Sequence, residues 1–595
     1  MVSGSAIATL VVFILSIICV IYPFSFPVYL PYLKRRRIPV DLTTAPIIAI
    51  LVLWAAQCLG PGQVRSGTDG VKPYNILILF FSLAYMAITL DITGILQAAA
   101  FWVSNKGGSN GWKLFLYFYM MLTALSVVLG NDPVILSGTA FLVYYTKVNE
   151  LNPVAWLMSE FAAANTASMV LFVGNPTNVV VCEGFQINNA AFTAYTILPF
   201  LACIVTSFFA LALQFHSQKY LPKKLNVSGD LDVRSVLLDP KGALVGSLLL
   251  GTCLVVIIVV SFFHVDVWKI SLPFAVAKFV FDMGWDHYRY MNKISMIGAH
   301  KAKKSDEDLS QAEDDIVLSQ LAQHRTNALK DEGDGKGEPN ERSSKAVTFE
   351  KNVTSEEPIP SLVPSPTETR NNTRSNTADT LRPGSNNKIS PSTSTPLPIP
   401  FFQQLKLFLH SYQHRISVHF PTIYTAFPRL PFALVPFAFS QFILIEALAH
   451  QGWIDIFARW LVIATGRRMY PTIWVVGVLG VILCNLSGTN IGATILLTKI
   501  VRSALLASAG GNLDAVNLNA FSRSAGIALA VASNIGAVSF TFSASLAGLL
   551  WKQILNQKGI HTIKQGTFAR WNILPIMVMT GVGMAVVSAE MAVLY

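Results

Sequence analysis

Ten long apolar segments along the 595-residue chain constrain its fold more than any other feature. They are Ile7–Val28, Ala45–Leu59, Ile76–Leu90, Leu114–Leu129, Phe192–Leu213, Ala243–Phe263, Leu430–Ala449, Ile473–Leu483, Ile527–Phe542 and Leu574–Val593. Most approach the roughly 20 residues with which a helix crosses the hydrocarbon core of a bilayer. Only 13% of the residues are charged, whereas about 25% are charged in a typical soluble domain. The sequence therefore predicts an all-α polytopic membrane protein with about ten to twelve crossings.

A basic cluster, Lys34 to Arg37, directly follows the first apolar segment. Because cytoplasmic loops are rich in Lys and Arg, we expect this cluster in the cytoplasm and the N-terminus on the opposite face. The first segment has no basic residue before it and no small-residue cleavage signature, so we expect a retained helix. The net charge of +11 needs no nucleic acid to explain it, because basic loops orient helices and meet anionic lipids. The sequence is compatible with a location in either the plasma membrane or the vacuolar membrane.

The chain divides into two apolar parts separated by a polar one. From about residue 286 to residue 405 the composition changes to charged residues, Ser, Thr, Asn and Pro, which cannot bury enough apolar surface to fold. We expect an N-terminal transmembrane helix with a basic loop (1–40), a first transmembrane repeat (41–285), a disordered cytoplasmic loop (286–405) and a second repeat (406–595).

The two apolar parts share short patterns in the same order. "NDPVILSGTAFLV" from Asn131 matches "NIGATILLTKIV" from Asn490, each with a Thr eight residues on. "AANTASMVLFVGNPTN" from Ala163 matches "ASNIGAVSFTFSASLAGLLW" from Ala532, each opening with a small residue and Asn. This order predicts an internal duplication.

The stretch "VGNPTN", residues 173–178, combines helix breakers and amides within an apolar segment. Pro176 removes a backbone donor and clashes with the preceding turn, while Gly174, Asn175 and Asn178 allow a bend. Backbone groups in hydrocarbon must be satisfied, so an interrupted helix survives where it is buried in protein or lines a polar site. The alternative is a Pro kink with Asn side chains bonding between helices. The matching break in the second half favours a binding site built from helix ends.

These motifs resemble the ion transporter superfamily, which contains arsenite permeases, related sodium/proton antiporters, citrate transporters and sodium-coupled dicarboxylate carriers. The resemblance covers about residues 40–280 and 420–595. "SNIGAVSFTFSASLAGLLW" is similar to the second-half signature of the arsenite permease branch. Departures from the family pattern are Ala164, Ala167-Ser168, Ala537 and Ala544. Gly-Asn-Asp at residues 130–132 differs from the Ser-Asn-Thr tips of the dicarboxylate carriers, which leaves the arsenite permease-like branch ahead.

The resemblance implies two inverted repeats, each with a re-entrant hairpin and a discontinuous helix, in a homodimer that works by an elevator-type movement. It implies substrate- or ion-binding roles for Asn131, Asp132, Asn165, Thr166, Gly174, Asn175, Pro176, Thr177, Asn178, Thr489, Asn490, Ser533, Asn534, Gly536, Ser543 and Ser545. Sodium is a candidate ligand near Asn131 and Asn490. We expect no cofactor and no resident metal, and a proton or sodium ion for coupling.

Asp132 is the first candidate for coupling, because an acid within the membrane is expensive and usually functional. The alternative is that it caps the helix that begins after Pro133. Four other acids near segment ends are expected to be interfacial and solvated: Asp91, Glu160, Glu183 and Glu446. Lys147, Lys499 and Arg502 are expected to snorkel to the head groups. His410, His414 and His419 are expected on a surface helix without a metal.

The function that these features favour is secondary transport of a small anion or oxyacid, such as arsenite, another inorganic anion or a carboxylate, driven by protons or sodium. The alternatives are a sodium/proton antiporter of the same superfamily and a channel or receptor on the same scaffold. An enzyme is disfavoured, because no hydrolase, metalloprotease or cofactor fingerprint is present. The expected partners are the lipid bilayer, the substrate and a second copy of the chain.

Overall fold

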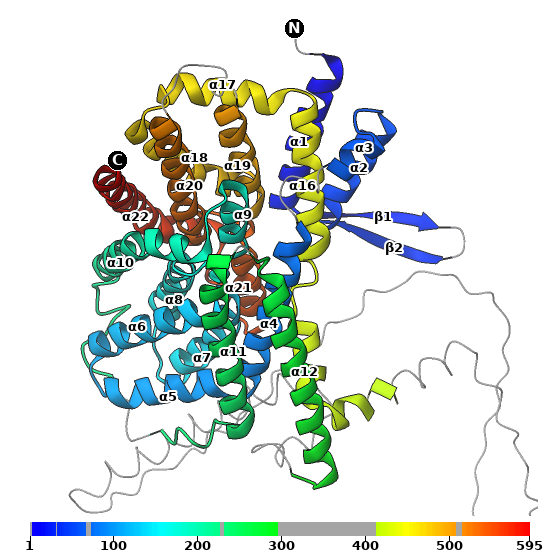
Figure 1. The fold of residues 1–595 in the computed structure, drawn as a ribbon. Coiled ribbons are helices and arrows are strands. Elements are labelled where there is room, and N and C mark those ends of the chain that lie inside the picture. Colours follow the sequence, from blue (N-terminus) through cyan, green and yellow to red (C-terminus); the bar gives the residue numbers. More distant parts are fainter. Residues whose placement is uncertain are drawn as a thin grey trace, which may run out of the picture. The chain divides into compact units, whose positions relative to one another are not determined.

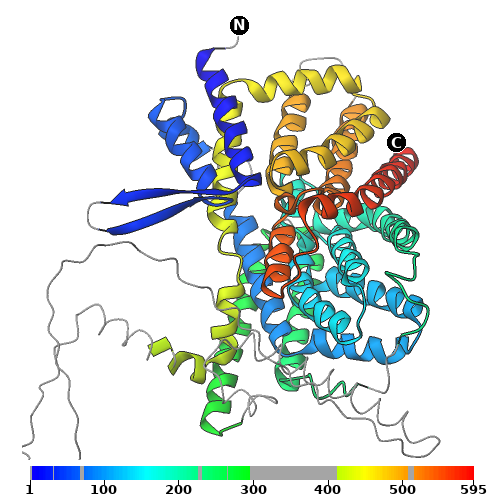
Figure 2. The same cartoon turned by 180° about the vertical axis from the view of Figure 1, so that it is seen from behind.

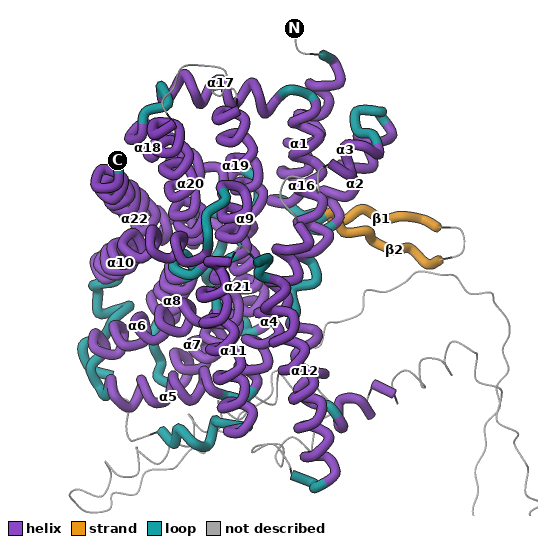
Figure 3. Tube along the Cα trace, viewed as in Figure 1, coloured by secondary structure: helices purple, strands orange, loops and turns teal. Residues whose placement is uncertain are grey.

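The structure, a computed structural model, describes residues 3–30, 33–66, 73–225, 231–263, 265–294, 412–413, 415–506 and 515–595. The chain divides into two units, residues 1–332 with 413–595, and residues 333–412. All elements named below belong to the first unit (Figure 1). Helices dominate it, and one two-stranded sheet accompanies them (Figure 3).

The elements up to residue 214 are α1 (Gly4–Ile21), β1 (Phe24–Leu30), β2 (Leu33–Val40), α2 (Thr44–Ala55), α3 (Pro61–Ser66), α4 (Pro73–Ile92), α5 (Ile95–Gly107), α6 (Gly111–Leu129), α7 (Asn131–Val148), α8 (Pro153–Ala167), η1 (Phe172–Gly174), α9 (Pro176–Phe185) and α10 (Asn189–Gln214). The later elements are α11 (Pro240–Val260), η2 (Ser261–Phe263), α12 (Trp268–Met291), α15 (Pro421–Ala426), η4 (Phe427–Arg429), α16 (Leu434–His450), α17 (Trp453–Thr465), α18 (Met469–Leu486), α19 (Asn490–Leu506), α20 (Ala515–Val538), η5 (Phe542–Ala544), α21 (Leu546–Gln557) and α22 (Gln565–Leu594).

Nine helical segments of the described part are long and apolar enough to cross a membrane. They are α1, α4, α6, α10, α11, α15 with α16, α18, α20 and α22. Each coincides with one of the ten predicted segments. The tenth, residues 45–59, contains α2, which has only 12 residues and is too short to cross alone. The described spans are therefore fewer than the ten to twelve expected.

The predicted basic loop forms a β-hairpin instead. Helix α1 ends at Ile21, because Pro23 disfavours helical backbone at the residue before it. β1 and β2 then pair antiparallel, from Phe24 opposite Val40 to Leu30 opposite Leu33. The first apolar segment, predicted to reach Val28, therefore stops short and continues as a strand rich in aromatic residues.

The order of elements from α4 to α10 repeats from α16 to α22. Helices α5 and α17 both have 13 residues, and each follows a glycine in the left-handed region, Gly94 (φ 85°) and Gly452 (φ 78°). In each half the next two helices form a hairpin, α6 with α7 and α18 with α19. The hairpin is followed by one helix (α8 or α20), a short 3₁₀ turn (η1 or η5), a short helix (α9 or α21) and a long helix that contains a proline (α10 or α22). This order confirms the predicted duplication.

The two halves interlock rather than forming separate bodies. Helix α7 of the first half packs against α21 of the second, and α19 of the second half packs against α9 of the first. Corresponding helices α5 and α17 lie at opposite ends of the bundle in both views (Figures 1 and 2), as inverted repeats require. One hydrophobic core contains Phe118 and Trp156 from the first half together with Trp551 and Met579 from the second.

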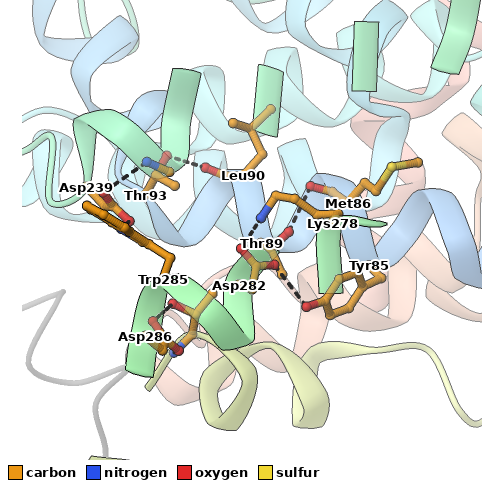
Figure 4. A network of polar contacts seen from close by, with 12 residues as sticks. Tyr85, Met86, Thr89, Leu90, Thr93, Asp239, Lys278, Asp282, Trp285 and Asp286 are labelled. Atoms are coloured by element: carbon orange, nitrogen blue, oxygen red, sulfur yellow. Dashed lines mark hydrogen bonds and ion pairs between the residues drawn. The ribbon is translucent and has the colours of Figure 1, made fainter. Parts of the chain in front are cut away.

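Helix α12 carries a buried polar network. Lys278 is ion-paired with Asp282, which also accepts a hydrogen bond from Tyr85 of α4 at 2.9 Å (Figure 4). Asp286 is ion-paired with Arg289 and accepts the Thr422 backbone N–H of α15 at 2.9 Å. Asp286, the expected start of the polar loop, therefore lies inside a helix. The expected loop beyond residue 294 lies outside the described residues.

Candidate functional site

The helix of the first half is interrupted where the sequence predicts it. After α8 the chain forms the short η1 turn before α9. Pro176 is the first residue of α9, where its missing N–H leaves no bond unmade. Asn175 caps α9, because its Oδ1 accepts the Thr177 N–H at 3.1 Å. A Cβ at Gly174 would lie 2.3 Å from the Ser168 carbonyl oxygen, so this turn requires glycine.

The second half has a matching interruption without a proline. Helix α20 ends at Val538, η5 follows, and α21 begins after Ser545. The Ser545 hydroxyl accepts the Gly548 N–H at 3.0 Å, as Asn175 does for α9. Asn485, which precedes the tip of the second hairpin, accepts the Phe540 N–H at 2.6 Å and holds the freed backbone. The discontinuous helices are thus present in both halves.

A buried cluster of amide side chains joins the first interruption to α20; we call it the asparagine junction, formed by Ser168, Asn175, Asn178 and Asn534. The Asn534 Nδ2 donates to Asn178 Oδ1 at 2.7 Å. The Asn534 Oδ1 accepts the Ser168 hydroxyl at 2.9 Å and the Asn175 Nδ2 at 3.3 Å. All four side chains are buried. The junction therefore links the two halves through hydrogen bonds that water cannot supply there.

Five further predicted residues lie on α7, α8, α9 and α20. Asn131, at the tip of the first hairpin, donates to Asn165 Oδ1 of α8 at 3.1 Å. Ser533 donates to Thr177 Oγ1 at 3.2 Å, directly beside the asparagine junction. Thr166 instead contacts the Met579 sulfur at 3.3 Å and packs in the core.

The remaining predicted residues of the second half make local contacts. The Thr489 hydroxyl accepts the Gly492 N–H at 3.2 Å and caps α19. Gly536 allows α20 to pass close to Cys484, since a Cβ there would lie 2.6 Å from the Cys484 Cβ. Asn490 is buried, and the buried Ser543 hydroxyl has no hydrogen-bond partner among the described residues. Within the described part, none of these four residues hydrogen-bonds to the asparagine junction.

A large cavity of about 1400 Å³ opens beside the first hairpin tip. Its lining includes Gly130, Asn131, Asp132, Gly174 and Leu546. The tip of the second hairpin does not line it. The cavity therefore reaches the first interruption and the start of α21 from one side of the protein.

Helix α7 begins at this cavity without a side-chain cap. Its N-cap residue is Gly130 (φ 83°), which has no side chain to accept the first-turn amides. By contrast, Asn175, Ser545 and Thr489 cap α9, α21 and α19. An uncapped helix N-terminus presents free N–H groups and the positive end of the helix dipole. In α7, Pro133 has no N–H, so the first-turn donors that could face an anion are the N–H groups of Asn131, Asp132 and Val134.

Asp132 lies in the first turn of α7 and also lines the cavity. Its side chain is half-buried and makes no hydrogen bond or ion pair with a described residue. The alternative that it caps the helix is wrong, because Gly130 occupies the cap position. The carboxyl group therefore remains available to a cation, a proton or a water molecule.

Two of the acids expected at the interface are buried. Glu160 has no exposed surface, and Asp91 is 2% exposed and 3.6 Å from the Arg429 guanidinium. Glu446 is ion-paired with Lys499. The prediction that the Lys499 ammonium group extends to the lipid head groups is therefore wrong. Position near the end of an apolar run did not reveal that neighbouring helices cover these groups.

The described histidines form no metal site. His419 lies 2.9 Å from His287, from Nε2 to Nδ1, and no group of three or more potential ligand side chains was found among the described residues. His410 and His414 lie outside them.

Sequence reasoning missed two residues of the site. Ser168 appeared only as a departure from the family pattern, yet it binds Asn534. Gly130 precedes a recognised motif, and its lack of a side chain is what leaves α7 uncapped. For Ser168 and Gly130 alike, the signal available in the sequence was a small residue next to a predicted interruption or hairpin tip.

Comparisons with known proteins agree with the resemblance stated above. A family described as Citrate transporter matches residues 5–297. The Arsenical pump membrane protein of Escherichia coli is 24% identical over 38% of this chain and 59% of its own length, and that of Yersinia enterocolitica is 25% identical over 38% and 54%. The chain thus matches little more than half the length of these relatives. The solved YdaH transporter of Alcanivorax borkumensis aligns with 99% of this chain and 98% of its own at 10% identity and a TM-score of 0.35.

The family match and the similarity to the arsenical pump membrane proteins confirm the resemblance to the ion transporter superfamily. Together with the nine candidate spans, they identify the chain as an integral, multi-pass membrane protein.

Proposed function

We propose that this chain is a secondary active transporter of a small anion or oxyacid, coupled to a proton or sodium gradient. The observation that carries the proposal is the uncapped N-terminus of α7, which opens on the cavity beside Asn131 and Gly174. Backbone N–H groups and the helix dipole favour a negative charge at this point. Three cationic side chains line the same cavity, Lys147, Arg429 and Lys558, of which Arg429 is paired with Asp91. Lys147 and Lys558 are placed where they can attract an anion, and Asp41 and Asp132 are acids of the same lining.

The chemistry of the cavity limits the substrate class. Arsenite oxyacids and short carboxylates are small and present several oxygen acceptors to N–H donors. The names of the relatives, an arsenical pump protein and a citrate transporter, fit this class. Asp132 would repel an anion unless it carries a proton or holds a cation. Its position therefore supports coupled binding of the substrate with a proton or sodium ion.

Alternating access requires that the site face each side of the membrane in turn. The asparagine junction ties α9 to α20, so these helices would move as one body. The cavity opens to the first hairpin and not to the second. We propose that the inverted repeat allows an elevator-type movement that exposes the second hairpin instead, in a homodimer.

The test is transport in proteoliposomes with radiolabelled citrate, arsenite and phosphate under imposed pH and sodium gradients. We expect gradient-driven accumulation of at least one probe, and exchange of labelled for unlabelled probe without a net gradient. Asp132→Asn should retain exchange and lose the response to the gradient. Flux without exchange would identify a channel, and sodium/proton exchange without any anion would identify an antiporter; either result overturns the proposal.

A further inference from the structure

Glu160 of α8 is a fully buried acid that the proposed binding site does not use. Its two carboxyl oxygens lie 3.0 and 3.1 Å from the hydroxyl of Thr139 on α7. The adjacent Gly138 leaves the space that the carboxyl group occupies, since a Cβ there would lie 2.6 Å from Glu160 Oε1. The first hairpin and the discontinuous helix are therefore shaped around this acid.

No cation balances Glu160 within the described part of the chain. The described charged residues on α6, α7, α20, α21 and α22 are Lys113, Asp132, Lys147, Arg523, Lys552, Arg570 and Glu590; α10 has none. None of them is ion-paired with Glu160. An unpaired carboxylate in such a site is costly, so the neutral acid is the stable form. Acids kept at such cost within membranes commonly serve proton transfer.

A small void, lined mostly by apolar side chains and not by Glu160 itself, lies beside Gly138 and shares residues with the substrate cavity. Gln97, Ser137 and Phe141 line both the cavity and this void of about 10 Å³. Gly138, which lies against the Glu160 carboxyl group, lines that void as well. The void is close to the volume that one water molecule needs. The Gln97 Oε1 atom is buried without a described hydrogen-bond partner, so it can accept a hydrogen bond from this water.

We propose that Glu160 carries a proton in this transporter in addition to Asp132, and exchanges that proton with the cavity through the void between Gln97, Ser137 and Gly138. In this step the Glu160 O–H bond breaks, one water in the void accepts the proton and releases a proton to water in the cavity, and the remaining Glu160 carboxylate keeps the Thr139 hydroxyl as hydrogen-bond donor. The reverse transfer restores the acid. This inference rests on the proposed function and specifies the coupling ion as a proton.

Infrared difference spectroscopy of the purified, lipid-reconstituted protein tests the proton site without any substrate. A change of pH should give a carbonyl band of a protonated carboxylic acid in the wild type. The Glu160→Gln variant should lose this band. The matched control, Glu150→Gln, removes an exposed carboxyl group at the turn after α7. This variant should retain the carbonyl band. An unchanged band in Glu160→Gln overturns the proposal.

Transport with labelled citrate and arsenite tests coupling. Glu160→Gln preserves size and the bond from Thr139, so it should fold, retain exchange and lose pH-gradient-driven uptake to the level of empty liposomes. Gly138→Ala should displace the carboxyl group and reduce the same uptake. Full pH-driven uptake by Glu160→Gln overturns the proposal. If the wild type transports neither probe, the function proposed above fails for these substrates, while the infrared result still decides whether Glu160 exchanges a proton.

Discussion

Asn534 of the second half donates its side-chain amide to Asn178 of the first half at 2.7 Å, across a separation of 356 residues. The same side chain accepts the hydroxyl of Ser168 and the amide of Asn175. A single asparagine therefore satisfies three groups at the interruption of the other repeat. Because both partners are buried in the interior, no water replaces the bond when one is removed.

Asn534→Ala should abolish transport while the protein still inserts into the membrane. The substitution leaves the buried Asn178 Oδ1 and Asn175 Nδ2 without their Asn534 partner, at about 1–3 kcal/mol for each unsatisfied group. The interruption should then lose its fixed geometry. Asn175→Ala should act in the same way, with the added loss of the α9 cap. Uptake in proteoliposomes and membrane-fraction yield are the measurements.

The control for this prediction is Asn556→Ala, which removes an exposed asparagine from the end of α21. It should transport as the wild type does. Wild-type uptake by Asn534→Ala would show that the asparagine junction is not part of the transport machinery.

Gly174→Ala should destabilise the first interruption. The new methyl group would lie 2.3 Å from the Ser168 carbonyl oxygen, which is backbone and cannot move aside easily. Overpacking of this kind costs about 1–3 kcal/mol. The apparent Tm of the purified protein should fall, and transport should fall with it. Gly251→Ala on α11, where nothing lies within 4 Å, should leave the Tm unchanged or raise it; equal effects at both positions would contradict the steric argument.

The interrupted helices were predictable because local chemistry specifies them. Pro176, Gly174 and Asn175 cannot continue an apolar helix, so the break in the first half follows from residue type alone. The second break has no proline, and only the internal repeat and the family resemblance pointed to Ser543–Ser545. The membrane spans were also predictable from local sequence, because a helix of about 20 apolar residues is long enough to cross the hydrocarbon core of a bilayer.

The environment of single polar groups was not predictable, because packing between distant segments determines it. Glu160 lies where a solvated acid was expected, and Thr139 and Gly138 of another helix cover it. Asn490 occupies the position equivalent to Asn131, yet only Asn131 lines the cavity. Whether Asn131 or Asn490 lines a cavity depends on which side of the protein is open. That is a property of the protein's conformation, and neither sequence motif encodes it.

Lys558 should make anion uptake dependent on pH. This residue follows α21, lines the cavity, and its ammonium group contacts the Tyr144 hydroxyl. Burial lowers the pKa of Lys558 to about 8. The side chain is therefore charged below pH 8 and becomes neutral as the pH rises through that value. The attraction for an anion is lost in the same interval.

The KM of the wild type for an anionic probe should accordingly increase as the pH rises past about 8. Lys558→Gln should show a high KM at all pH values, without this step. Lys552→Gln removes an exposed charge on the same helix outside the cavity lining and should retain the step. A step that persists in Lys558→Gln would assign the titration to another group or to the probe.

Deleting residues 306–390 should leave membrane insertion and basal transport intact. The helices on either side of the deletion are joined by direct contacts within the described part of the chain. Asp286 of α12 accepts both the backbone N–H and the hydroxyl of Thr422 on α15, each at 2.9 Å, and His287 bonds His419. These contacts within the described residues hold α12 against α15.

The same contacts give the deletion a sharper test. Asp286→Ala in the deletion variant removes one of the two carboxylates paired with the buried Arg289 and both hydrogen bonds that Thr422 donates to Asp286, while Asp239 still pairs with Arg289. We expect the deletion alone to elute as a single species in size-exclusion chromatography and to transport at the wild-type rate, whereas the combined variant should aggregate. Loss of insertion by the deletion alone would mean that residues 306–390 support the fold, because the Asp286 and His287 contacts would then be insufficient.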